Sequence, residues 1–469
     1  MQTQANNAQN PLGTEKVRKL LPKYAVPSIV SMLVMAIYNM VDQIFIGHYV
    51  GYLGNGATTV AFPLVTIMMA LALMVGNGSA AAISLSLGRG DSSACRKIIG
   101  NALMLNLVFS GAIMAVVLTF MDPVLVFLGA QPNVMPYARD YVAVIVYGAP
   151  FAMISASLGN IIRADGSPRY SMVANMTGAI SNIFLDWLLM GRGMGVRGAA
   201  IATITAQALS MLLVLYYFFR QAKYTRLELP QMKPAPHIIR QMCGLGSSSF
   251  VTQIGITILN IVLNNSITHY GAMSEYGADI PLAAIGVVTK INSIIINLIL
   301  GVAIGAQPIL GYNYGAKNYR RVRETYRTTI TCTVIISTVG WLAFMFKPNI
   351  FIGLFGDSDP RFNTFASYVL QVYLGAVFAS GFQIPSSNYF QAVGKPMLSM
   401  TLTMTRQLLL LIPLILILPR FFGLNGILYA GPIADITAAL VTAVFIAREL
   451  RQLNLHIMPQ DSAVPASGK

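Results

Sequence analysis

The sequence predicts an all-α integral membrane protein whose twelve transmembrane helices form two parallel six-helix repeats around a central cavity. Composition is the first reason: 55% of the 469 residues are hydrophobic and only 10% are charged, whereas a typical soluble protein carries about 25% charged residues. Apolar runs long enough to cross a bilayer then recur along the whole chain, and motifs of the first half return in the second. These observations exclude a soluble domain of this length.

The predicted spans follow one another with short connections. About 20 apolar residues cross the hydrocarbon core of a bilayer. The segments that meet this requirement are 24–47, 57–87, 98–121, 139–162, 169–191, 196–220, 243–268, 281–311, 326–347, 364–391, 397–418 and 424–447. The second and eighth are unusually long, which indicates tilt or extension beyond the bilayer.

The basic residues predict the orientation. With the N-terminus inside, the tails and inner loops carry 23 of the 31 Lys and Arg, and the outer segments carry six. Because positive residues collect on the cytoplasmic side, we expect both termini to be cytoplasmic and the protein to lie in the plasma (inner) membrane. The net charge of +15 then reflects topology, not nucleic-acid binding. The polar first 23 residues predict a cytosolic tail and not a cleavable signal peptide.

The chain resembles itself at an offset of 228 residues. ADGSPRYSM at 164–172 aligns with AVGKPMLSM at 392–400, and GVRG at 195–198 with GLNG at 423–426. Six helices in each half place both halves in the membrane with the same orientation, as parallel repeats. The predicted parts are a tail at 1–23, an N-lobe at 24–220, a cytoplasmic linker at 221–241, a C-lobe at 242–448 and a tail at 449–469. This plan is typical of transporters that work by alternating access.

Enzyme chemistry is not indicated. The three cysteines and four histidines are scattered, so no disulfide framework, metal site or nucleophile–base arrangement is predicted. No P-loop is present, because AVGKPM lacks both the glycine spacing and the Ser or Thr after lysine. We therefore expect no enzymatic activity and no cofactor. Energy must come from an ion gradient, which requires a titratable or cation-binding group at membrane depth.

Two carboxylates of the first half are the leading candidates for that group. Asp42 lies 19 residues beyond Lys23, and Asp186 lies 17 beyond Arg169. At 1.5 Å per residue both sit about 25–29 Å above the inner basic boundary, in the outer half of the bilayer. Such a pair can exchange protons near neutral pH or bind Na⁺ through its oxygens. The alternative is that either carboxylate faces water at the outer interface.

Polar neighbours can complete this site. Tyr38 and Asn182 each lie four residues before one of the two carboxylates, so each shares a helix face with it. Oxygens from other spans can come from Asn160, Thr203 and Thr205.

Three further charged residues lie in the interiors of spans, away from the span ends. Asp435 is either a polar lining group or the partner of a basic residue. Lys290 is a candidate for that partner or faces the cavity, with structural pairing preferred. Arg406 is expected to extend towards the inner interface.

The chain resembles the multidrug and toxic compound extrusion (MATE) family from about residue 20 to 450. The resemblance rests on the duplicated plan and on motifs in order: Pro-Ser-Ile-Val at Pro27, YNMVDQIFIG around Asp42, ADGSPRYSM, Asn182 with Asp186, and GVRGAAIATITAQ. It implies an acidic pair in the N-lobe that binds H⁺ or Na⁺, at Asp42 and Asp186. It also implies a polar network like Tyr38, Asn160, Asn182 and either Thr203 or Thr205.

Some members of the family carry a second cation site in the C-lobe, with acidic residues on the seventh and tenth spans. Residues 250–267 and 364–391 contain no acidic residue. This favours the DinF/MepA-like branch, whose coupling sits in the N-lobe.

The implied function is export of lipophilic, often cationic compounds in exchange for H⁺ or Na⁺, by a monomer in the lipid bilayer. Pro27, 15 residues before Asp42, can let the first span bend. The alternative is a flippase for a lipid-linked anionic precursor, from the same superfamily. A flippase of that kind needs a strongly cationic cavity, and Lys290 and Arg406 are the only basic residues in the interiors of the spans, away from their ends.

Overall fold

The computed structural model describes residues 10–227, 233–277, 279–353 and 360–457. All regular secondary structure in these residues is helical. The helices group into two compact units. Unit 1 comprises Met1–Ala25, Leu87–Gly90 and Ile258–Lys469, and unit 2 comprises Val26–Ser86 and Asp91–Thr257.

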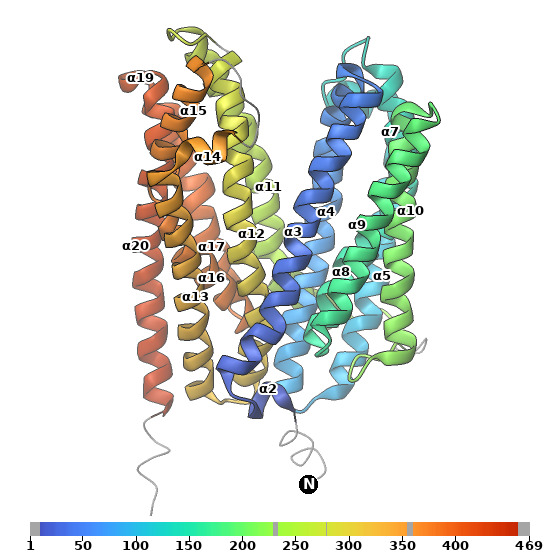
Figure 1. Cartoon of the computed structure of the whole chain (residues 1–469). Helices are drawn as coiled ribbons and strands as arrows, with labels where there is room; N and C mark the ends of the chain where they lie inside the picture. Colours follow the sequence, from blue (N-terminus) through green and yellow to red (C-terminus); the bar gives the residue numbers. More distant parts are fainter. Residues whose placement is uncertain (1–9, 228–232, 278, 354–359, 458–469) are drawn as a thin grey trace, which may run out of the picture. The chain divides into compact units, whose positions relative to one another are not determined.

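Unit 2 is built from the helices of the first half of the chain (Figure 1). It contains most of α3 (Val17–Tyr49) and α4 (Tyr52–Gly88), all of α5 (Ser92–Thr119), α6 (Met121–Phe127), α7 (Met135–Tyr147), α8 (Ala149–Ala164), α9 (Pro168–Gly191), α10 (Gly195–Tyr216) and the π-helical turn η1 (Tyr217–Gln221), and the first part of α11 (Pro236–Ala272). The turn at Gly51 and the α9–α10 turn lie at one end, where Gly191 approaches the Tyr49 hydroxyl. We call this the Gly51 end, and the opposite end, with the α8–α9 turn at Asp165, the Asp165 end.

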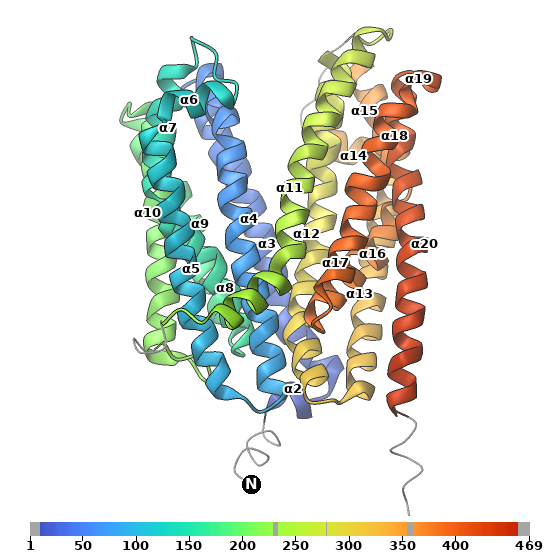
Figure 2. The same ribbon diagram turned by 180° about the vertical axis from the view of Figure 1, so that it is seen from behind.

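Unit 1 contains the helices of the second half together with the short N-terminal helix α2 (Figure 2). Its elements are α2 (Pro11–Thr14), the start of α3, the end of α11, α12 (Asp279–Gly315), α13 (Tyr319–Phe346), α14 (Pro348–Gly353), α15 (Pro360–Tyr373), α16 (Val377–Ala392), α17 (Pro396–Met404), the π-helical turn η3 (Thr405–Leu411), α18 (Ile412–Ile417), α19 (Pro419–Phe422) and α20 (Leu424–Ile457). One apolar core joins α11, α12, α13, α15, α16 and α20.

The helices account for the twelve predicted spans. Among the described residues, nine helices are long and apolar enough to cross a membrane, and two bent pairs each qualify as one further span. The twelfth is α9, whose 24 residues reach about 36 Å. Its polar residues, Asn182 and Asp186 among them, lower its mean hydropathy.

The bent pairs occupy equivalent places in the two halves. The pair α7 and α8 is bent by 52° at Gly148, and α15 and α16 are bent by 47° just before Val377. Gly148 and Ala376, the N-cap residues of α8 and α16, are separated by the repeat offset of 228. The predicted spans 139–162 and 364–391 are thus each made of two helices, and both halves bend at equivalent residues.

Several helices extend beyond their apolar runs. Helix α3 begins at Val17, within the predicted tail 1–23. Helix α11 begins at Pro236, within the predicted linker 221–241, and α20 continues to Ile457, within the predicted tail 449–469. The physical reason is that apolar length measures only the hydrocarbon crossing, whereas a helix can continue into the polar layer on its charged residues. Residues 1–9, 228–232 and 458–469 of these predicted segments lie outside the described residues.

Candidate functional site

The two carboxylates predicted from depth lie next to one another in unit 2. Asp42 of α3 is 8% exposed and Asp186 of α9 is fully buried. The two carboxyl groups are near enough to hydrogen-bond to each other when one of them is protonated. As carboxylates both can only accept, and Asp42 Oδ1 and both Asp186 oxygens then have no donor among the described residues. These buried oxygens can therefore serve as ligands for a cation.

Helix length brings these side chains to one level. Asp42 precedes the end of α3 by seven residues, Asp186 precedes the end of α9 by five, and Thr203 follows the start of α10 by eight. At 1.5 Å per residue all three lie about 8–12 Å from the Gly51 end. The pair is thus placed by the regular rise of neighbouring antiparallel helices.

Two phenols lie close to the acid pair. Tyr38 is one turn before Asp42 on α3, and Tyr141 comes from α7, where it is 7% exposed. Both ring hydroxyls lie close enough to Asp42 and Asp186 to interact electrostatically with these two groups. Tyr141 was not among the sequence candidates. Its depth matches that of the pair, because it follows the start of α7 by six residues, but depth alone does not say which face of α7 it occupies.

The structure distinguishes the two candidate threonines. The Asn182 amide nitrogen donates to Thr203 Oγ1 at 3.3 Å, while Asn182 Oδ1 is buried without a donor. Thr205 is exposed, and its hydroxyl donates to the carbonyl of Ile201 in its own helix at 2.7 Å. Thr203 therefore joins Asn182 beside the acid pair, and the expectation for Thr205 is corrected because its side chain points elsewhere.

Asn160 belongs to a different polar cluster, and its predicted place beside the acid pair is corrected. Its amide donates to Asn77 Oδ1 at 2.7 Å, and its Oδ1 accepts from the Arg163 guanidinium. Arg163, one residue beyond the predicted span 139–162, is 4% exposed and also donates to Ser171 Oγ at 3.1 Å. Ser171 precedes Asp186 by 15 residues on α9, which is about 22 Å along the helix. This cluster therefore lies near the Asp165 end.

The charged residues of unit 1 pair differently from the prediction. Arg406 Nε donates to Asp435 Oδ1 at 2.7 Å, and both side chains are largely buried. Arg406 therefore does not extend to the interface, and Lys290 is not the partner of Asp435. Lys290 is exposed on α12, and its side chain has no ion pair within the described part of the chain. Pairing neutralises one of the two span cations that a flippase cavity would need.

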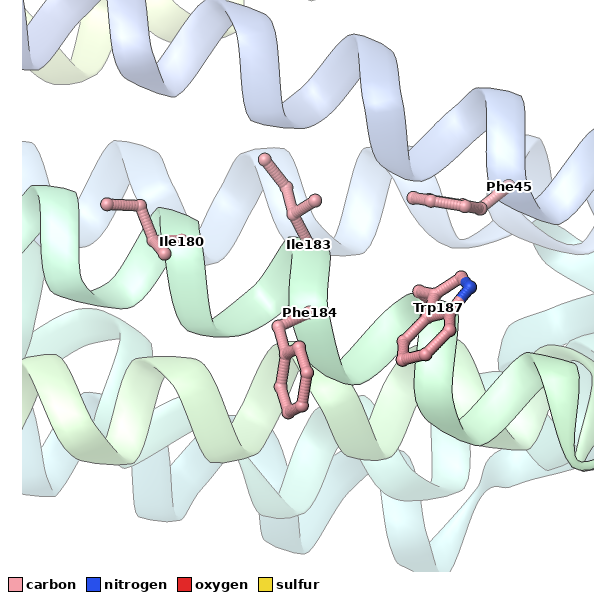
Figure 3. A pocket seen from close by; sticks show the side chains of 5 residues that line it. All are labelled: Phe45, Ile180, Ile183, Phe184 and Trp187. Carbon is pink, nitrogen blue, oxygen red and sulfur yellow. The ribbon is translucent and has the colours of Figure 1, made fainter.

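An apolar groove runs between α3 and α9 close to the acid pair (Figure 3). Phe45, Ile180, Ile183, Phe184 and Trp187 line it, and its volume is about 390 Å³. Phe45 follows Asp42 by three residues and Trp187 follows Asp186 by one. These two neighbouring residues of α9 lie in different surroundings, because Asp186 is buried inside the unit and the exposed Trp187 ring lines the groove.

The acid pair is not part of a typical metal-binding cluster within the described residues. Among the described residues, no three His, Cys, Asp or Glu side chains come together. The donors at the acid pair are carboxylate, amide and hydroxyl oxygens, which suit a proton or a hard monovalent cation.

Comparisons with known proteins agree with this fold. The sequence profile of the MatE family matches residues 27–188 and 249–417. Multidrug export protein MepA of Staphylococcus aureus (strain N315) is 25% identical over 433 residues, covering 92% of this chain and 93% of that protein. The MATE multidrug transporter DinF-BH, solved in complex with a ligand, is 34% identical with a TM-score of 0.86, over 93% of this chain and 96% of that one.

A further solved structure shares the fold. It is an outward-facing MATE family transporter of the MOP superfamily, with a TM-score of 0.88 and 23% identity, covering 94% of this chain and 98% of that one. The family profile matches well over half of the chain, once in each half. The chain therefore belongs to the MatE family of multidrug transporters.

Proposed function

We propose that this transporter exports lipophilic, often cationic compounds in exchange for H⁺ or Na⁺ bound at Asp42 and Asp186. The single observation that carries the proposal is the buried carboxyl pair, three of whose oxygens lack a donor among the described residues. Two negative charges in contact in a low-dielectric site repel strongly. Binding one cation between them relieves that repulsion, so the pair has a favourable occupied state and a strained empty one.

Either coupling ion is compatible with the donors. A proton would be shared by the two carboxyl groups, with the Tyr38 and Tyr141 hydroxyls close by. Na⁺ would take oxygens from the carboxylates, from Asn182 Oδ1, which has no donor, and from the neighbouring Thr203 hydroxyl. Both ions supply one positive charge, and the same pair can respond to either.

Cation binding can act on α3 because Asp42 lies on that helix. The division between the two compact units falls inside α3, between Ala25 and Val26. Pro27 follows at once, and a proline removes one intrahelical hydrogen bond and weakens the helix there. Pro27 is therefore the bending point of α3 in this proposal. In the outward-open state the acid pair takes up the cation, α3 changes its packing, and substrate binding is weakened.

The substrate class follows from the groove beside the pair. Its aromatic and aliphatic lining can hold a flat apolar molecule, and an aromatic face also attracts an organic cation. MepA is a multidrug export protein, and DinF-BH is a multidrug transporter. The distribution of basic residues supports a topology with both termini in the cytoplasm. We further propose that the protein works as a monomer in the plasma membrane.

The test is export from sealed vesicles with pH and Na⁺ gradients imposed separately. Asp42→Asn and Asp186→Asn keep the shape of the side chains but remove the cation-binding charge. We expect each to lower gradient-driven export of a fluorescent cationic dye at least tenfold, while dye binding by the purified variant persists. The matched control is Asp140→Asn, an exposed carboxylate next to Tyr141 on α7, which should export normally. Full gradient dependence in Asp186→Asn would overturn the assignment.

A further inference from the structure

A basic pocket lies in unit 1, away from the acid pair. It opens between the start of α3 and the first turns of α13, with a volume of about 920 Å³. The residues that line it are Arg18, Leu21, Pro22, Arg320, Arg323, Glu324, Arg327, Thr328, Thr331 and Cys332. The α13 members recur at helical spacing and so share one face of that helix. The pocket therefore presents four guanidinium groups against one carboxylate.

The segment that forms one wall is held by other groups. Arg321 Nε donates to the carbonyl of Leu12 at 3.2 Å, and its terminal nitrogen donates to the carbonyl of Glu15. Asn313 Nδ2 also donates to the carbonyl of Leu12, at 2.9 Å. These bonds fix α2 and the start of α3 against α12 and α13, at one end of unit 1 (Figures 1 and 2). The wall is thus built without using the pocket arginines.

The pocket arginines have no protein partner within the described residues. No ion pair or hydrogen bond joins Arg18, Arg320 or Arg327 to a carboxylate there, although Glu324 lines the same pocket. Arg323 Nε is buried and has no acceptor. A buried guanidinium donor without an acceptor lowers the stability of the folded protein. An acceptor from outside the chain would remove that penalty.

The same helix face continues as an apolar track. Beyond Arg327 and Thr331, α13 exposes Ile335, Val339, Leu342 and Phe346, which are 56%, 60%, 39% and 75% exposed. From Arg327 to Phe346 is 19 residues, or about 28 Å, close to the ~30 Å hydrocarbon thickness of a bilayer. When the track spans the hydrocarbon, the arginines lie at the level of the lipid headgroups.

We propose that this pocket binds the phosphate headgroup of an anionic glycerophospholipid, whose acyl chains lie along the exposed face of α13. Guanidinium groups bind phosphate oxygens with paired hydrogen bonds, and basic pockets between membrane helices select anionic headgroups. A zwitterionic lipid carries a quaternary or primary ammonium, which the arginine cluster repels. The occupied pocket ties the N-terminal segment to α13 and so stabilises that end of unit 1. This proposal rests on the membrane location and is independent of the coupling ion and the exported compound.

The test is lipid titration into the delipidated protein in a zwitterionic detergent, with bound lipid counted by native mass spectrometry. Phosphatidylglycerol should bind at least tenfold more tightly than phosphatidylcholine. The double variant Arg320→Gln/Arg323→Gln should lose that preference. The control Arg448→Gln/Arg451→Gln removes two exposed arginines at the same spacing on α20 and should stay within twofold of wild type. Equal losses in both double variants would show only a diffuse surface charge and would overturn the site.

Two further arms separate the sources of phosphate and guard against misfolding. Inorganic phosphate at millimolar concentration should not compete with phosphatidylglycerol, and competition at that level would make the ligand a soluble phosphate and not a lipid. Photo-crosslinking of wild type with a diazirine phosphatidylglycerol should label 318–332, whatever the stability of the variants. Labelling confined to other segments would refute the proposal.

Discussion

The buried ion pair of unit 1 supports a quantitative prediction. Arg406 Nε and Asp435 Oδ1 are 2.7 Å apart, and the side chains are 18% and 7% exposed. With charge centres about 4 Å apart and an effective dielectric constant of about 20, their attraction is about 4 kcal/mol. Asp435→Asn removes this attraction and leaves the Arg406 guanidinium buried without its counter-charge. We expect this variant to lose about 3–5 kcal/mol of unfolding free energy.

The double variant separates the interaction energy of the pair from the effects of the two single substitutions. Arg406→Gln alone should cost a similar amount, because it leaves the Asp435 carboxylate unpaired. Arg406→Gln/Asp435→Asn removes both charges and keeps two groups that can hydrogen-bond, so it should recover most of the loss. The coupling energy of the double-mutant cycle should be about 2–4 kcal/mol.

The assay is unfolding by sodium dodecyl sulfate in mixed micelles, followed by the fluorescence of the two tryptophans. Trp341 lies in the same unit as this pair, and Trp187 lies in unit 2. The chain offers a matched control in the pair of Arg139 and Asp122, whose atoms are 2.6 Å apart but whose side chains are 55% and 54% exposed. Its cycle should give less than about 1 kcal/mol, because solvent screens an exposed pair. If Asp435→Asn were no more destabilising than Asp122→Asn, the reasoning from burial would be refuted.

Two more predictions concern helix ends and helix contacts. The Ala94 N–H bound to the exposed N-cap Asp91 lowers the pKa of that carboxyl, so the cap stabilises the fold above the ordinary aspartate range near pH 4 and is lost as the pH falls. Asp91→Ala should cost about 1 kcal/mol at pH 7 and progressively less on acidification in the same unfolding assay, and a pH-independent cost would contradict this. A Cβ on Gly78 would lie 2.0 Å from the Met242 carbonyl oxygen, whereas one on Gly244 meets nothing within 4 Å. Gly78→Ala should therefore lose about 3 kcal/mol and Gly244→Ala should be unchanged or slightly stabilised, and equal effects would show that the contact does not limit packing.

Depth along a helix is predictable from sequence because the rise per residue is constant. That arithmetic placed Asp42 and Asp186 at one level, and they lie together in the structure. The same arithmetic, applied from the basic boundary, would have separated Asn160 from them, since it lies four residues from the end of α8. Tyr141 was missed for a different reason. Which face of α7 turns towards α3 and α9 depends on helix packing, and apolar patterning in a membrane does not report it.

The pairing of Asp435 shows where depth alone is insufficient. Lys290 follows the start of α12 by 11 residues, and Asp435 follows the start of α20 by 11. Both therefore lie about 17 Å along their helices, and depth favours that pair. The packing of the helices gives Asp435 a different partner, because α20 packs on η3, which carries Arg406. The partner of Asp435 therefore depends on which helices are neighbours in the bundle. The sequence of a single span does not carry that information.

The two halves show how one scaffold is given different chemistry. Both bend before the second helix of a pair at equivalent residues, Gly148 and Ala376, so the backbone plan of the repeat persists. At the offset of 228, however, Asn182 and Asp186 correspond to Leu410 and Leu414. These leucines pack against the apolar core of unit 1. A position that tolerates a buried carboxylate in one unit is thus filled by a core contact in the other.

That difference bears on which unit responds to a cation. In unit 1 the buried carboxylate of Asp435 already has a permanent counter-charge from its own chain, so binding a proton or Na⁺ there would have to displace Arg406. In unit 2 the carboxylates of Asp42 and Asp186 face each other with unpartnered oxygens. Their charge balance can be completed only from outside the described chain. In the cycle that we propose, the gradient therefore acts on the unit whose two acids are paired with each other. The buried acids of unit 1, Asp435 and Glu449, keep their counter-charges from Arg406 and Lys395 throughout that cycle.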